Sequence, residues 1–127
     1  MLDIELPDYI QGVLSLHDQT VIRDYVYASK DQMDQFAFRE RAIRGLRYKY
    51  IDNYQAGSVG ARHLTSRDRL AVMQDLWSLF ESGNLNEQQA YWFKPRPREE
   101  FYDLVKDLYE VHNLAGDRAF TIAMSRY

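Results

Sequence analysis

Hydrophobic and polar residues alternate with a period of two along much of the first half of the chain, which is the pattern of β-strands. Strands are expected over Thr20–Ser29, Phe36–Arg44 and Tyr48–Tyr54. The charged segment Lys30–Gln35 is expected to turn between the first two strands, and Gly45–Leu46 to reverse the chain before the third. The last two strands would then pair as an antiparallel hairpin.

After residue 65 the apolar residues recur every three or four positions, which predicts an amphipathic helix. This helix is expected to begin at an N-cap, Ser66, and to end at Gly83. Asn86 is expected to cap a shorter helix, Glu100–Leu104 to form a fourth strand, and Asp117 to cap a last helix. The core-facing side chains of the main helix would be Leu70, Met73, Leu76, Trp77 and Phe80.

Strands that are segregated from helices along the chain predict an α+β fold. The expected architecture is a small antiparallel β-sheet of about four strands packed against one main helix, with short and C-terminal helices in addition. The chain has 127 residues, so we expect a single domain over 1–127.

The composition narrows the function classes. A net charge of −3 argues against a nucleic-acid-binding protein, which normally has a basic excess. The absence of cysteine excludes disulfides, thiolate metal sites and a cysteine nucleophile from these residues. No apolar run approaches the length of a membrane span, so we expect no membrane partner and a soluble protein whose compartment is open.

Five segments carry motifs in a characteristic order. They are Leu6–Gly12, Arg23–Asp34, Arg41–Tyr54, Met73–Ala90 and Glu99–Ala115. The third reads Arg-Ala-Ile-Arg-Gly-Leu-Arg-Tyr-Lys-Tyr-Ile-Asp-Asn-Tyr, and the fifth begins Glu-Glu-Phe-Tyr-Asp-Leu and ends Asn-Leu-Ala. Together they resemble the C-terminal subdomain of type I, formylglycine-dependent sulfatases, in the alkaline phosphatase superfamily. One departure is Leu108, which stands where the family usually has proline.

The resemblance implies that residues 1–19 are a junction segment from a catalytic domain, which would be the partner of this chain. In that family, hydrolysis of the sulfate ester uses Ca²⁺ and a formylglycine that is made from the first residue of a Cys/Ser-x-Pro-x-Arg motif. The chain has three prolines, and none lies in that motif: the nearest segment, Phe93–Pro97, has Phe at the nucleophile position and Pro at the arginine position. We therefore expect no catalytic residue, no metal ligand and no cofactor in this chain.

The charged segment between the first two strands is the candidate substrate-binding site, with Lys30, Asp31 and Asp34 as its residues. The resemblance implies that the subdomain flanks the catalytic cleft, and a loop with both signs of charge can hold a hydroxylated or sulfated ligand. The alternative is a solvated turn. Lys30, Gln32 and Gln35 replace residues that are more usual in the family, which affects any contact made by this loop.

Other polar groups have a structural and a functional interpretation. The face formed by Tyr48, Tyr50 and Tyr54 could stack on sugars, but packing against a helix is favoured. The carboxylates of Asp103 and Asp107 could form an acid–base pair, but a turn residue and a cap are favoured. The basic residues of the hairpin could attract a sulfated polymer, but solvated strand edges are favoured for them: Arg41, Arg44, Arg47 and Lys49.

The sequence thus leads to the hypothesis of a sulfatase C-terminal fragment, which buttresses the catalytic domain, shapes its substrate cleft and is inactive alone. The alternative is a free-standing interaction or carbohydrate-binding module. In either case an apolar face meant for docking would be exposed, which predicts self-association of the isolated chain.

Overall fold

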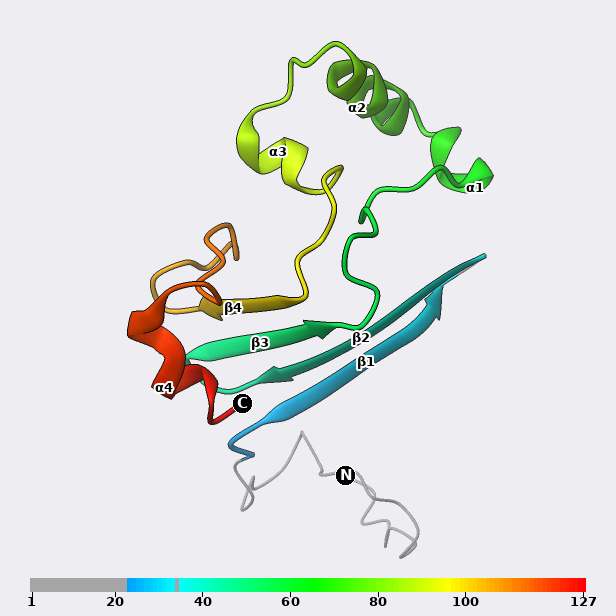
Figure 1. The fold of residues 1–127 in the computed structure, drawn as a ribbon. Coiled ribbons are helices and arrows are strands. Elements are labelled where there is room, and N and C mark those ends of the chain that lie inside the picture. Colours follow the sequence, from blue (N-terminus) through cyan, green and yellow to red (C-terminus); the bar gives the residue numbers. More distant parts are fainter. Residues whose placement is uncertain (1–22, 34) are drawn as a thin grey trace, which may run out of the picture.

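A computed structural model describes residues 23–33 and 35–127 of the chain. Four strands form one antiparallel sheet in the order β1-β2-β3-β4 (Figure 1). The strands are β1 (Val26–Met33), β2 (Phe36–Arg44), β3 (Tyr48–Asn53) and β4 (Glu99–Asp103). The helices are α1 (Thr65–Asp68), α2 (Ala71–Glu81), α3 (Glu87–Tyr91), the 3₁₀ helix η1 (Arg118–Phe120) and α4 (Thr121–Met124). The predicted α+β fold is confirmed.

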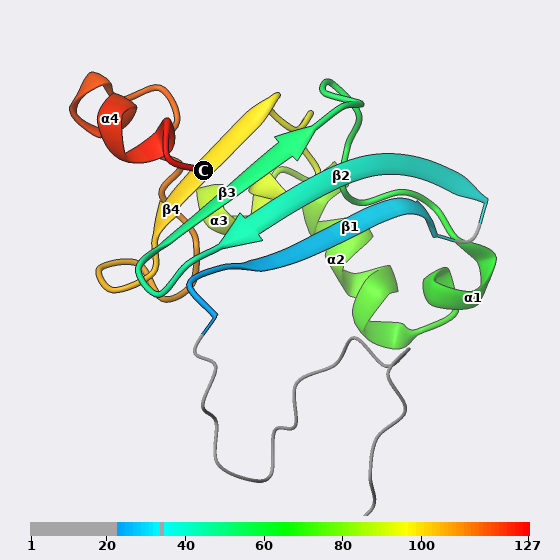
Figure 2. The same ribbon diagram turned by 90° about the horizontal axis from the view of Figure 1, so that it is seen from below.

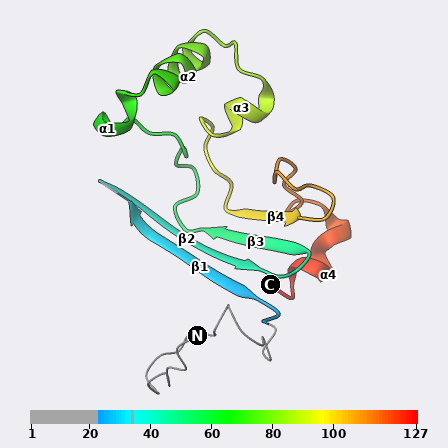
Figure 3. The same cartoon turned by 180° about the vertical axis from the view of Figure 1, so that it is seen from behind.

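The helices are divided between the two sides of the sheet. Helices α1, α2 and α3 lie over one face, and α2 is the element of this layer that stands furthest from the strands (Figures 1 and 3). Seen from below, the sheet lies in front of these helices, and the C-terminus lies in front of the sheet (Figure 2). Within the described residues, no helix combines the length and apolar character needed to cross a membrane.

The strand boundaries agree with the sequence pattern except in the first hairpin. Strand β2 has the predicted bounds, and β3 and β4 each differ by one residue at one or both ends. The expected turn at Lys30–Gln35 is wrong, because β1 continues to Met33. Lys30 pairs with Glu40 on β2, an opposite-charge pair of the kind that favours sheet pairing, and the ladder resumes after a register shift at Gln32. Residues 1–22, including the predicted junction segment 1–19, and the start of the predicted first strand lie outside the described residues.

The predicted main helix is divided into two. Helix α1 begins at Thr65, so Ser66 is inside it and is not the N-cap, and α2 begins separately after Leu70, whose backbone is extended. The carboxylate of Asp68 fixes the join, because it accepts a hydrogen bond of 3.2 Å from Trp77 Nε1 of α2. The other cap predictions are confirmed: Asn86 forms a capping box at α3, and Asp117 accepts from the first turn of η1.

The main core lies on β3 and β4. Phe101 is fully buried, and its ring stacks on Tyr48 with 5.0 Å between centroids. Tyr127 and Phe120, from the end of the chain, pack edge-on against Tyr48. The tyrosine face of β3 is therefore covered at Tyr48 by the C-terminal segment, whereas Tyr54 is exposed.

A second, smaller cluster holds the helical layer together. Phe93, after α3, is buried and contacts Trp77 and Phe80 of α2 at centroid distances of 4.9 and 4.5 Å. Of the five predicted core positions of the main helix, Met73 is buried, while Leu70 and Phe80 are exposed. The amphipathic pattern identified the helix correctly, but the apolar face of α2 is wider than the surface it covers.

Two segments connect the helical layer to the sheet, and they run side by side. Val59 and Pro95 form an isolated antiparallel bridge, and the amide of Ala61 donates to the carbonyl of Trp92 at 2.8 Å. Gly60 permits this approach, because a Cβ at that position would lie 2.8 Å from the Trp92 ring. The two segments fix the height of the helical layer above β1 and β2.

Candidate functional site

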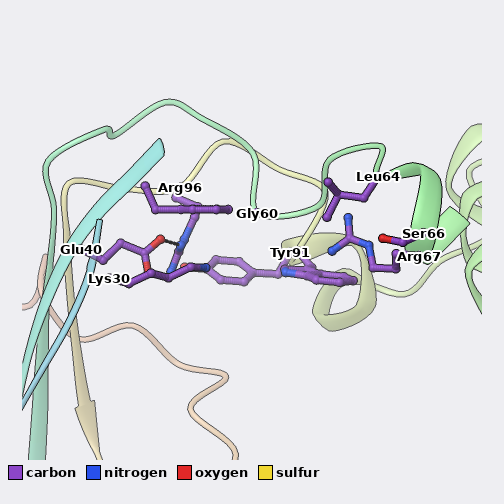
Figure 4. A pocket seen from close by; sticks show the side chains of 10 residues that line it. Lys30, Glu40, Gly60, Leu64, Ser66, Arg67, Tyr91 and Arg96 are labelled. Carbon is purple, nitrogen blue, oxygen red and sulfur yellow. Dashed lines mark hydrogen bonds and ion pairs between the residues drawn. The ribbon is translucent and has the colours of Figure 1, made fainter. Parts of the chain in front are cut away.

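A cavity of about 490 Å³ lies between the helical layer and the sheet (Figure 4). We call it the interlayer cavity. Its walls come from β1, β2, α1, the end of α3 and the two connecting segments, and its charged lining residues are Lys30, Glu40, Arg67 and Arg96. The volume is within the range of small-molecule sites. Three cations and one carboxylate therefore face a space that can hold a ligand.

At the sheet end of the cavity, Arg96 belongs to a closed polar network. It forms ion pairs with Glu40 and, at 3.6 Å, with Glu100. Glu100 is buried and also accepts hydrogen bonds of 2.6 Å from Tyr102 and from Asn53. Burial, and then the hydrogen bond to Glu100, raise the pKa of Tyr102 far above its ordinary value, so its phenol stays a donor. Two carboxylates thus neutralise Arg96, and its role is to hold the wall.

Lys30 is also at the sheet end, but no acid among the described residues neutralises its charge. It lies directly across from Glu40 in the strand register, yet the Glu40 carboxylate is bound to Arg96. Its Nζ lies 3.5 Å from the centroid of the Phe38 ring, a cation–π contact. In the part of the chain that the structure describes, no carboxylate forms an ion pair with Lys30. Its ammonium therefore has hydrogen-bond donors to offer.

Arg67, at the helical end, is a second cation without an ion-pair partner among the described residues. Its guanidinium stacks on the Trp92 ring at 5.1 Å, and one terminal nitrogen donates to the backbone oxygen of Arg62. Its Nε is buried and finds no hydrogen-bond acceptor among residues 23–33 and 35–127. Buried donors are almost always satisfied, so an unsatisfied one indicates a place where water, an ion or a ligand binds. The guanidinium is held in one orientation with donors to spare.

Aromatic rings form much of the remaining wall. Trp92, Tyr91 and Phe38 line the cavity, and the Tyr91 ring lies between the labelled cations in the close view (Figure 4). Burial raises the pKa of Tyr91, so its phenol stays neutral. The cavity therefore combines apolar surfaces with an excess of positive charge.

The structure separates the three residues predicted to bind substrate. Lys30 lines the interlayer cavity, whereas Asp31 lies on the other side of the sheet, where it forms an exposed ion pair of 2.7 Å with Arg41. Neighbouring residues of a strand point to opposite faces, and the sequence interpretation of a loop missed this. Asp34 lies outside the described residues.

Sequence reasoning missed Arg67 and Arg96 as companions of Lys30. The three residues are far apart in the chain: Arg67 belongs to a segment that was interpreted as a helix start, and Arg96 to one that was interpreted as extended. One signal was present for Arg96, because prolines on both sides restrict its backbone to an extended form. No comparable signal marks Arg67.

Three of the four basic residues of the hairpin, Arg41, Arg47 and Lys49, form ion pairs with acids. Arg47 forms an ion pair of 2.8 Å with the buried carboxylate of Asp103, and Lys49 one of 2.6 Å with Glu110. The hydrogen bond from Arg47 holds the pKa of Asp103 below its ordinary value. Asp103 and Asp107 are structural acceptors, since Asp107 accepts from the His112 amide at 2.7 Å. The interpretation of these carboxylates as a turn residue and a cap agrees with these contacts.

The described residues do not fit a Ca²⁺ site. No group of three or more His, Asp or Glu side chains converges in 23–33 and 35–127. His63 is occupied by other contacts, because its ring stacks on Trp77 at 3.9 Å and its Nδ1 lies 3.0 Å from Asp68. No step of a metal-dependent reaction is therefore assigned to these side chains.

Comparisons with known proteins point to sulfatases. An ulvan-active sulfatase of Formosa agariphila is 36% identical over 112 residues, which are 87% of this chain and 19% of that protein. A second ulvan-active sulfatase of the same organism is 30% identical over 115 residues, 91% of this chain and 18% of that protein. The chain thus spans about a fifth of the length of these curated relatives. No protein-family profile matches it.

Solved structures show the same fold. The structure of a 2-O GAG sulfatase superposes with a TM-score of 0.58 at 20% sequence identity. The superposition covers 97% of this chain and 19% of the sulfatase chain. A Bacteroides thetaiotaomicron VPI-5482 protein with a provisional sulfatase assignment superposes over the same shares, with a TM-score of 0.56 at 22% identity.

The fold defines the class first: a small α+β unit that corresponds to a limited part of a much larger enzyme. The sequence matches then relate this unit to sulfatases. The chain is homologous to a segment of sulfatases, and the resemblance to a sulfatase C-terminal subdomain predicted from the motifs is confirmed.

Proposed function

We propose that this chain is the part of a sulfatase that buttresses the catalytic domain and forms one wall of its substrate cleft, and that it has no hydrolase activity alone. The observation that carries the proposal is the match to about a fifth of two curated sulfatases, in a chain without a Cys/Ser-x-Pro-x-Arg motif. The names of those relatives support ulvan as the substrate of the whole protein.

The chemistry of the reaction would belong to the catalytic domain. We expect that domain to supply the formylglycine nucleophile and the Ca²⁺ ion. The residues of this chain would act on the substrate only by binding and orienting it, which is the contribution that a positioned wall makes to a reaction.

Exposed apolar side chains support a docking role. The segment after β4 exposes Val105, Leu108 and Tyr109, with 73%, 73% and 84% of their surfaces accessible. Clustered apolar exposure of this kind is typical of interaction sites. We propose that the catalytic domain covers this segment, and that the isolated chain self-associates through it.

An exchange experiment tests the proposal. The matching segment of the Formosa agariphila ulvan-active sulfatase is deleted or replaced by this chain, and release of sulfate from ulvan is measured with Ca²⁺ present. Deletion should abolish activity, and replacement should restore a measurable part of it. The isolated chain should release no sulfate under the same conditions.

Each arm has an outcome that contradicts the proposal. Sulfate release by the isolated chain would show that it carries a complete active site. A deletion protein that keeps full activity would show that the segment is not needed for the cleft. A soluble replacement protein without activity would show that this chain cannot serve as the wall.

A further inference from the structure

We propose that the interlayer cavity binds a sugar that carries two oxyanion groups, sulfate ester or carboxylate, with one group at Lys30 and the other at Arg67. This inference rests on the proposed function, because it names the ligand that this wall of the substrate cleft would hold. The binding itself can be measured without any turnover.

The first argument is the difference between the cations of the cavity. Arg96 is neutralised by two carboxylates, whereas Lys30 and Arg67 have no ion-pair partner among the described residues. Both side chains are half-buried, where a charge without a partner is costly, and an anionic ligand reduces that cost. Two unpaired cations therefore favour a ligand with two negative groups over a neutral one.

The second argument is the preorganisation of Arg67. Its guanidinium is clamped between the Trp92 ring and the Arg62 carbonyl, while the buried Nε has no acceptor. An oxyanion in the plane of the guanidinium can accept from this nitrogen, and charge-assisted bonds of this kind are among the strongest hydrogen bonds in proteins. Because the side chain is already ordered, binding costs little conformational entropy.

The third argument is the wall between the two cations. Tyr91 and Trp92 provide ring surface there, and Tyr91 stays neutral because burial raises its pKa. A sugar ring has apolar C–H faces that can lie on such rings and hydroxyls that can bond with the phenol. An inorganic anion alone would bind the cations but would not contact the rings. The cavity of about 490 Å³ is also too large for such an anion.

Single-stranded nucleic acid is the other ligand that uses cations and aromatic rings together. The chain has a net charge of −3, and a strand of nucleic acid would need a basic track that extends beyond the cavity. The hairpin does not provide that track, because three of its four cations, Arg41, Arg47 and Lys49, are bound to acids. The observations therefore favour a sugar.

The experiment is isothermal titration of the 127-residue chain with ulvan oligosaccharides, with the same material after chemical desulfation, with inorganic sulfate and with oligo(dT). The sulfated oligosaccharide should bind, and inorganic sulfate should bind far more weakly. Retained affinity after desulfation would assign the oxyanions to carboxylates, and affinity that falls at least tenfold would assign them to sulfate. No binding of either sugar, or tighter binding of oligo(dT), would overturn the proposal.

Variants test the location. Lys30→Gln and Arg67→Gln should each weaken sugar binding by about tenfold, since each removes a charge-assisted hydrogen bond. Arg67→Lys should also lose most of the affinity, because an ammonium lacks the planar fork. The matched control is Arg41→Gln, which removes one charge on the opposite face, where Arg41 is paired with Asp31. It should change the affinity less than twofold.

Equal losses in Lys30→Gln and Arg41→Gln would indicate diffuse attraction and would overturn the assignment to the cavity. Circular dichroism of each variant shows whether it is folded. If Arg67→Gln unfolds, Lys30→Gln still decides, because the cation–π contact of Lys30 with Phe38 contributes little to stability. The titration and the exchange experiment have separate readouts, so either proposal can fail while the other holds.

Discussion

The β3–β4 end of the sheet and the interlayer cavity over β1 and β2 are both rich in charge, but they use it differently. At β3–β4, Asp103 is almost completely buried and paired with Arg47, and Lys49 is paired with Glu110. In the cavity, Lys30 and Arg67 lie against aromatic rings, and neither forms an ion pair with a described residue. At the β3–β4 end, these charges are neutralised by acids of the chain itself. In the cavity, two cations are not neutralised by any described residue.

This difference teaches how to separate charges that hold a fold from charges available to a ligand. Neither sequence position nor residue type distinguishes the two groups, since both lie in mixed-charge segments. The distinction comes from the partner: a buried charge is tolerated when it is paired. The β3–β4 end should therefore be sensitive to changes in stability, and the cavity to changes in ligand binding.

The largest expected effect comes from removing the centre of the β3–β4 core. Phe101→Ala should lower the free energy of unfolding by about 4 kcal/mol, because Phe101 is fully buried and its removal leaves a cavity between Tyr48 and the C-terminal segment. Urea unfolding, followed by tyrosine fluorescence, measures this loss.

The matched control for this change is Leu79→Ala in α2. Leu79 is 41% exposed, so its removal should cost less than about 1 kcal/mol. Similar costs for the two variants would contradict the division into a complete core and an incompletely covered helical layer.

A smaller effect, with a distinct dependence on pH, is expected at Arg47. The hydrogen bond from Arg47 lowers the pKa of Asp103 below its ordinary value of 3.8. The stability from this pair is therefore fully present above that value and is lost as the pH falls through the lowered pKa. Arg47→Gln should lower the melting temperature at neutral pH by a few degrees.

The gap between the original chain and Arg47→Gln should close as the pH falls below 3.8, because protonated Asp103 no longer gains from the guanidinium. Melting temperatures of both proteins across this range provide the measurement. A gap that stays constant to the acid end would mean that Arg47 stabilises the chain by packing and not by charge.

The sequence predicted the last three strands and two of the three helix caps, since their signals are local. Alternation predicted the bounds of β2, and Asn86 and Asp117 form the caps that their residue types favour. The division of the main helix at Leu70 was not predictable, because it depends on contacts of Asp68 with the distant Trp77. Periodicity cannot report such a contact.

The candidate site was predictable only in part. Lys30 was named, but its companion Arg67 comes from another layer of the fold, and their meeting depends on the paired connecting segments near Val59 and Pro95. Asp31 was assigned to the same site, although it lies on a strand and its side chain points to the opposite face of the sheet. The mistake had one cause, which was the interpretation of a continuous strand as a charged turn.

The smallest expected effects compare the loss of stability on replacing each of two lysines, Lys49 at the β3–β4 end and Lys30 in the cavity. Lys49→Gln should cost about 1.5 kcal/mol, since it breaks a short bond to Glu110, and both side chains are about three-quarters buried. The backbone of Glu110 is left-handed, with φ at 55°, so the bond also holds a conformation that the loop would otherwise avoid. Lys30→Gln should cost only about 0.5 kcal/mol, the value of its contact with Phe38. Urea midpoints measured side by side decide the matter: equal costs would make Lys30 a structural residue and would remove it from the ligand site.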